Sequence, residues 1–130
     1  MAGEKRLEVL LKNMKPRQNA GDFVFCTVQS LSLINIQDVL FIFKEEEGIT
    51  LILRKEIADS LNLPYSFISS WITLTVHSSL EAIGLTAAFS KALAEENVSC
   101  NVVAAYYHDH IFVDKKDTEK AMTILNRFSE

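Results

Sequence analysis

The stretch WITLTVHSSLEAIGLTAAF, residues 71–89, places a strand-like pattern directly before a helix-like one. Apolar side chains such as Ile72 and Leu74 alternate with the residues between them, and this two-residue period is typical of a half-buried strand. After a polar loop, Leu85, Phe89 and their neighbours follow at helical spacing. We therefore predict a strand at residues 70–76 and a helix at residues 83–96.

The rest of the second half of the chain continues this alternation. Residues 99–107 have strand character, and the polar triplet His108, Asp109 and His110 separates them from a second apolar run at 111–113. Three polar residues between two strands indicate a hairpin turn. A helix is expected at 116–128, with Asp114 or Asp117 as a cap. The order β-α-β-β-α is a ferredoxin-like βαββαβ unit without its last strand.

The first half has a related but different order. Residues 7–14 show apolar side chains at helical spacing, and Pro16 ends that helix. Strands are expected at 22–28, 39–43 and 50–54, followed by a short helix at 55–61. This half looks like a similar unit without its first strand. We divide the chain into an N-terminal unit, residues 1–66, and a C-terminal unit, residues 67–130.

The two halves are incomplete, and no linker separates them. We therefore predict an α+β fold in which two incomplete ferredoxin-like units are packed together, sharing a sheet or face or completing each other. Two alternatives fit the same pattern. One is a single six-stranded α+β sheet, and the other is completion of each unit by a second chain.

Composition excludes several classes of function. The chain has 130 residues, 48% of them hydrophobic, which is enough for a real core. Its 13 Lys and Arg against 17 Asp and Glu give a net charge of −4, so we expect no nucleic-acid partner. The apolar runs are strand-length and no signal peptide is visible, so we expect no membrane partner and a cytoplasmic location. We expect Cys26 and Cys100 to act as small buried hydrophobes.

Four blocks of the sequence, residues 20–28, 47–53, 71–89 and 106–113, carry a resemblance that covers nearly the whole chain. They resemble small bacterial tandem ACT-domain proteins, with a more distant similarity to the cytosolic arginine sensors of animals. The resemblance implies tandem ACT-like units, each a ferredoxin-like regulatory module. Many ACT domains bind amino acids at the interface of two units, near the loop from the first strand to the first helix. The typical loop reads Asp-x-Pro-Gly-x-Leu, whereas this chain has Glu81 for the Asp and Ile83 for the Pro, and keeps Gly84.

The same loop, residues 77–85, has physical features that suit a ligand site. It enters the N-terminus of a helix, where unpaired N–H groups and the positive end of the helix dipole favour a carboxylate. Gly84 allows close approach, Ser78 and Ser79 offer hydroxyls, and Glu81 suits a ligand ammonium group. The alternative is that Ser78 and Glu81 only form a capping box. The complete predicted ligand-binding set is His77, Ser78, Ser79, Glu81, Ile83, Gly84, Leu85, His108 and His110.

The three histidines are expected to lie at one end of the C-terminal sheet. In the ferredoxin-like order 4-1-3-2, the end of the first strand, at His77, lies beside the turn that carries His108 and His110. They are expected to be either incidental surface residues of the turn or polar contacts in the ligand pocket. A metal site with Asp109 or Glu81 as a further ligand is a lesser alternative, and we expect no bound metal and no cofactor.

Two further expectations concern an aromatic pair and catalysis. We expect Tyr106 and Tyr107 to lie on opposite faces of one strand, one of them in the core. No catalytic triad order, P-loop or dinucleotide motif is present, so we expect no enzymatic activity. Three hypotheses follow. The first is a regulatory module that binds an amino acid or similar small molecule and acts by forming a homodimer, by docking on a partner, or by changing shape when bound. The second is a ligand-free interaction or oligomerisation module, and the third is a metal-dependent enzyme using the three His.

Overall fold

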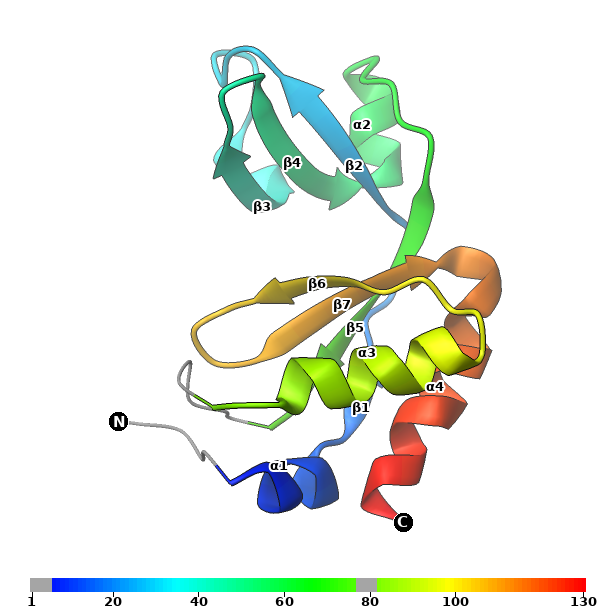
Figure 1. Cartoon of the computed structure of the whole chain (residues 1–130). Helices are drawn as coiled ribbons and strands as arrows, with labels where there is room; N and C mark the ends of the chain where they lie inside the picture. Colours follow the sequence, from blue (N-terminus) through cyan, green and yellow to red (C-terminus); the bar gives the residue numbers. More distant parts are fainter. Residues whose placement is uncertain (1–5, 77–81) are drawn as a thin grey trace. The chain divides into compact units, whose positions relative to one another are not determined.

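The computed structural model describes residues 6–76 and 82–130, and these fall into two compact units (Figure 1). The inserted unit is Gly21–Ser69. The main unit contains the described residues on either side of it, up to Ala20 and from Ser70 onwards. The chain therefore leaves the main unit, builds the inserted unit, and returns through one strand, β5 (Ile68–Leu74).

The main unit has four strands in the order β1-β5-β7-β6. They are β1 (Pro16–Gln18), β5, β6 (Asn101–Ala104) and β7 (Asp109–Asp114). Counted from β5, this is the ferredoxin-like order 4-1-3-2, and β1 takes the place of the fourth strand. The last strand that the second half of the sequence lacks thus comes from before the inserted unit, where β1 pairs antiparallel with β5.

Helices of the main unit cover one face of its sheet. They are α1 (Leu7–Asn13), α3 (Leu85–Glu95) and α4 (Thr118–Asn126), with short 3-10 turns η2 (Lys115–Asp117) and η3 (Arg127–Ser129) around α4. Figure 1 shows α3 and α4 on the same side of β5 and β7. Leu10, Leu74, Phe89 and Ile111 are fully buried in the core between helices and sheet.

The inserted unit also has a ferredoxin-like strand order. Its strands β2 (Phe23–Val28), β3 (Val39–Lys44) and β4 (Ile49–Arg54) run in the order β3-β4-β2, and the start of β5 pairs with β2 at Phe23 and Val24. Helix α2 (Lys55–Ser60) packs on β2 and β4 over a core that includes Val24 and Leu53. A 3-10 turn, η1 (Ile36–Asp38), stands where a ferredoxin-like unit has its first helix.

The tandem ACT-like α+β fold is confirmed, with four differences in detail. The first half lacks its first helix rather than its first strand. Helix α1, which we placed in the N-terminal half, packs against α3 and η3 of the main unit through Leu7, Leu10 and Leu11. Its helical pattern predicted a buried face but carries no information on which sheet that face covers. The division at residue 66 stays a prediction.

The turn between β6 and β7 is the third difference. It spans residues 105–108, closed by the Ala105 N–H donating to the His108 carbonyl at 3.0 Å, whereas Asp109 and His110 belong to β7. The predicted hairpin is confirmed and His108 lies in its turn, but the prediction that Asp109 and His110 also belong to the turn was wrong. The polar residues resembled a turn in the sequence although His110 belongs to a strand, because its side chain lies on the sheet face opposite the helices.

The aromatic pair is the fourth difference. Tyr106 and Tyr107 are 63% and 64% exposed at the tip of this turn, so the prediction of one core tyrosine was wrong. Their rings pack edge to face, with centroids 5.0 Å apart. Cys26 is buried and Cys100 half-buried, and both are free thiols. Burial raises the pKa of Cys100 to about 11, as fits an apolar role. Within the described residues, no helix is long and apolar enough to cross a membrane.

Candidate functional site

The predicted ligand loop is described only in part. His77, Ser78, Ser79 and Glu81 lie outside the described residues, and so does the capping box proposed for Ser78 and Glu81. The N-cap of α3 is Gly84, and the helix itself begins at Leu85. The ligand-binding role of the loop therefore stays a prediction.

The end of the loop has a defined local geometry. Gly84 has φ +93°, a left-handed conformation that glycine adopts without cost. A Cβ on Gly84 would lie 3.2 Å from Cδ2 of Leu7, so α1 also limits the size of this residue. Ile83 is 86% exposed, whereas the Leu85 side chain is buried in the core. At Leu85, therefore, only the backbone and not the side chain is positioned to contact a ligand at the helix start.

Among the described residues, the N-terminus of α3 has no negative group of its own. No side chain of residues 82–130 caps it, and its first turn contains no acidic residue. The helix has 11 residues, so the positive end of its dipole at Gly84 is not offset by a neighbouring carboxylate within the described chain. Such an end favours an anionic group.

The β6–β7 turn lies beside the end of β5, as the strand order predicts. Nδ1 of His108 is 3.2 Å from the carbonyl oxygen of Val76, the last described residue before the loop. A carbonyl only accepts, so Nδ1 of His108 carries the proton in this contact. The rings of His108 and His110 pack edge to face, with centroids 6.4 Å apart.

His110 is held in one protonation state by its neighbours. The Trp71 Nε1–H donates to His110 Nδ1 at 2.9 Å, and Thr73 Oγ1 lies 3.1 Å from the same atom. Asn19 Nδ2 donates to Thr73 Oγ1 at 3.0 Å, which leaves the Thr73 hydroxyl hydrogen for His110. An indole N–H only donates, so Nδ1 must be the unprotonated nitrogen and Nε2 carries the hydrogen.

The surroundings of His110 oppose its protonation. Its pKa is lowered first by burial, then by the nearby charges of His108 and Arg17. Protonation would also place a hydrogen on Nδ1, where Trp71 already donates. In contrast, burial raises the pKa of Asp109, and His108 partly offsets that effect. His110 is therefore a neutral group that presents the Nε2–H donor.

The sequence did not point to the partners of His110. Trp71 and Thr73 lie within a predicted strand but were not predicted as site residues, and neither were Asn19 and Arg17. The signal was present in the alternation of β5, because Trp71 and Thr73 share the face opposite Ile72 and Leu74. What was missing was the pairing of β1 with β5, which brings Asn19 to Thr73.

The metal alternative gains no support within the part of the chain that the structure describes. Over residues 6–76 and 82–130, no group of three or more His, Cys, Asp and Glu is arranged to hold a metal ion. His77 and Glu81, which that alternative also uses, lie outside this range.

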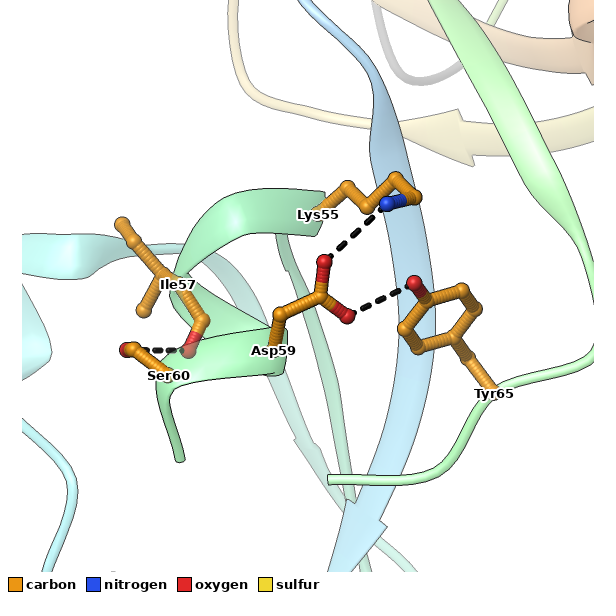
Figure 2. Close-up of polar contacts among 5 residues, drawn as sticks. All are labelled: Lys55, Ile57, Asp59, Ser60 and Tyr65. Carbon is orange, nitrogen blue, oxygen red and sulfur yellow. Dashed lines mark hydrogen bonds and ion pairs between the residues drawn. The ribbon is translucent and has the colours of Figure 1, made fainter. Parts of the chain in front are cut away.

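A polar cluster in the inserted unit ties α2 to the segment that follows it (Figure 2). Asp59 accepts from Lys55 Nζ at 3.0 Å and from the Tyr65 hydroxyl at 2.7 Å. These contacts lower the pKa of Asp59, with the Tyr65 hydrogen bond as the larger cause, and raise the pKa of Lys55. All three side chains are accessible to solvent, so we interpret the cluster as a surface link rather than a reactive centre.

Two hollows also lie in the inserted unit. One is an open depression of about 560 Å³ next to β2, and the other, about 150 Å³, lies beside η1 and α2. The first is lined by Phe25, Cys26, Thr27, Thr50, Pro64, Tyr65 and Ser66. Neither contains a cluster of charged side chains, so the polar groups that best suit recognition of a small molecule lie in the main unit.

Comparison with known families identifies the fold. One family model described as ACT domain matches residues 2–70, and a second with the same description matches residues 66–127. The chain belongs to the ACT domain family. No curated protein matches the chain. The overlap of the two ACT matches at 66–70 coincides with the start of β5, the strand shared by both units.

Solved structures share this fold. A Vibrio cholerae protein of unknown function, described as a possible transport protein, is 48% identical, with a TM-score of 0.86, covering 95% of this chain and 96% of that one. Aspartate kinase from Clostridium acetobutylicum is 12% identical, with a TM-score of 0.66, covering 90% of this chain and 34% of that one.

A third solved structure is E. coli aspartokinase III in complex with aspartate and ADP. It is 13% identical, with a TM-score of 0.57, covering 88% of this chain and 32% of that one. This chain therefore spans about a third of each kinase, and at these identities the likeness to the kinases shows the fold alone.

Proposed function

We propose that this ACT-domain protein is a non-catalytic regulatory module that binds an amino acid or a similar small molecule where β5 leads into α3. The observation that carries the proposal is the N-terminus of α3, where Gly84 has a left-handed backbone and no acidic side chain occupies the first turn. A ligand carboxylate fits that position. Membership of a family of amino-acid-sensing regulatory modules supports the class of ligand.

In this proposal, the other predicted residues contact the charged groups of the ligand. Ser78, Ser79 and Glu81 follow β5 in the chain, and His108 contacts the carbonyl of Val76, two residues past the end of that strand. In this proposal, Glu81 meets the ligand ammonium group and the seryl hydroxyls meet its carboxylate. The aspartate in the solved complex of E. coli aspartokinase III supports an acidic amino acid as the first ligand to test.

Thermal denaturation against the twenty amino acids tests this proposal. A ligand that binds only the folded protein raises its melting temperature with concentration. We expect such a rise for at least one amino acid, and a smaller rise in Glu81→Gln. Glu95→Gln, on the same helix, is the matched control and should respond as the unchanged protein does. If no amino acid at millimolar concentration shifts the transition, the proposal fails.

A second function, self-association into a homodimer, is supported by the surface of the inserted unit. Strand β3 is the edge strand of that unit, and its Leu40 and Phe43 side chains are exposed. An apolar strand edge is a surface on which another chain can pair. Mass measurement in solution tests this. Phe43→Ser should convert a dimer to a monomer, and a monomeric starting protein would exclude this function.

A further inference from the structure

The sheet of the main unit has a face opposite its helices, which we call the outer face. Cα partners on antiparallel strands point to the same side, so the pairing of Arg17 with Thr73 places both there. The same register places Lys15 beside Thr75, whose N–H donates to the Lys15 carbonyl at 2.9 Å. The outer face is thus defined by three rows of residues: Lys15, Arg17 and Asn19; Thr75, Thr73 and Trp71; His108, His110 and Phe112.

The outer face has a local charge opposite to that of the whole chain. The chain has a net charge of −4, yet these rows contain two cations and no acidic side chain. Lys15 and Arg17 are exposed, and neither forms an ion pair with any residue in the described part of the chain. Two neighbouring cations that lack a carboxylate partner favour an anion from outside.

The centre of this face adds a directed hydrogen-bond donor. Trp71 and Thr73 both point their hydrogens at His110 Nδ1, so the free nitrogen of the ring, Nε2, carries a hydrogen. No described residue accepts from Nε2, and no buried side-chain nitrogen or oxygen in the described chain lacks a partner, so Nε2 is accessible. The Arg17 charge is near enough to act on this ring.

We propose that the outer face binds an oxyanion, a carboxylate or phosphate group, between the Arg17 guanidinium and the His110 Nε2–H, with Lys15 adding positive charge. A guanidinium matches the two oxygens of such a group in a fork, and a neutral imidazole N–H supplies a third, fixed donor. The partly buried hydrogen bonds of Asn19, Thr73 and Trp71 hold that donor in place. This site lies on β1, β5 and β7, so it does not depend on an amino acid at α3.

Trp71 is the only tryptophan of the chain and stacks tilted against His110, with ring centroids 5.7 Å apart. Its fluorescence therefore reports directly on the site. The experiment titrates the full chain with inorganic phosphate and, separately, with succinate, with sodium chloride keeping the ionic strength constant. We expect a saturable change with one of the two anions. Saturation with phosphate alone assigns a phosphate group, and saturation with succinate alone assigns a carboxylate.

Single substitutions test whether the anion binds at the outer face. Arg17→Gln should weaken binding by at least about tenfold, because it removes the charged fork. Lys15→Gln should weaken it less, and Lys91→Gln on α3 removes one charge elsewhere and should leave it unchanged. All three positions are exposed, so folding should persist, which thermal denaturation checks. The proposal is overturned if neither anion gives a saturable change, or if Arg17→Gln and Lys91→Gln bind equally well.

Discussion

The main unit and the inserted unit use the same strand order but cover it differently. The main unit has α1, α3 and α4 on one face of its sheet, and its core includes fully buried side chains such as Phe89 and Leu125. The inserted unit has only α2, and a 3-10 turn in place of the first helix. Its large apolar side chains therefore remain partly outside the core, as Leu33, Ile36, Leu40, Phe43 and Leu61 show.

This difference shows which part of the fold carries stability and which part offers surface. A helix that covers a sheet removes apolar area from water, and the main unit has more such helices. The inserted unit keeps apolar area available to another molecule. The largest effects of substitution should therefore be found in the main unit.

The largest expected effect is that of Phe89→Ala on α3. Phe89 is fully buried, and removing a buried Phe side chain costs about 3–5 kcal/mol in free energy of unfolding. Urea denaturation followed by Trp71 fluorescence measures it. Phe43→Ala in the inserted unit is the matched control: its ring is 58% exposed, so the cost should stay below about 1 kcal/mol. Equal losses in free energy of unfolding for the two variants would contradict the conclusion that the main unit carries more of the stability.

Leu10→Ala tests the assignment of α1 to the main unit. Leu10 is fully buried, and this substitution should cost about 2–5 kcal/mol. Hydrogen exchange should show faster exchange of amides in β7, whereas amides in β4 of the inserted unit should keep their protection. Leu33→Ala, at a residue 85% exposed, serves as the control. Loss of protection in β4 with β7 unchanged would place α1 with the inserted unit instead.

Gly84→Ala tests how the left-handed backbone at the start of α3 affects the stability of the main unit. A left-handed backbone costs a residue with a Cβ about 1–2 kcal/mol, and the new methyl group would crowd Leu7. Thermal denaturation measures the loss. Gly84→Asn adds a Cβ but tolerates this φ better, so its loss should be smaller. If the two variants are equally stable, crowding rather than φ determines the cost.

The smallest effect is a pH dependence confined to the main unit, because the inserted unit contains no histidine. The pKa of His110 is below its usual 6.5 in the folded protein, so acidification favours the unfolded chain, which takes up the proton more readily. Main-unit stability should therefore fall as the pH drops below about 6.5, the usual pKa of histidine.

His110→Gln isolates this pH effect. Asp109, whose pKa is raised by burial, acts in the opposite direction, and it is unchanged in the variant. The loss of stability on acidification, followed by hydrogen exchange of β7 amides, should therefore be smaller in His110→Gln. An unchanged pH profile in the variant would show that other groups cause the loss.

The position of His108 was predictable from the sequence, but the contacts of His110 were not. The strand order that predicted His108 beside the end of β5 is the observed one, because a ferredoxin-like unit leaves few ways to order four strands. The network of Asn19, Thr73, His110 and Trp71 was not predictable. It depends on β1, a three-residue strand beginning with proline, which is too short to show an alternating pattern.

By itself, the sequence determined most elements of this protein, since period-two and helical spacing reflect local burial. The helices at 7–14 and 83–96 and the strands around 22–28 and 70–76 appear close to where they were predicted. It also determined the family, through a resemblance that covers nearly the whole chain. Only the tertiary structure decided that β1 and α1 complete the main unit and that Tyr106 and Tyr107 form an exposed turn. A periodic pattern shows that a face is buried, but pairing between residues distant in sequence decides what buries it.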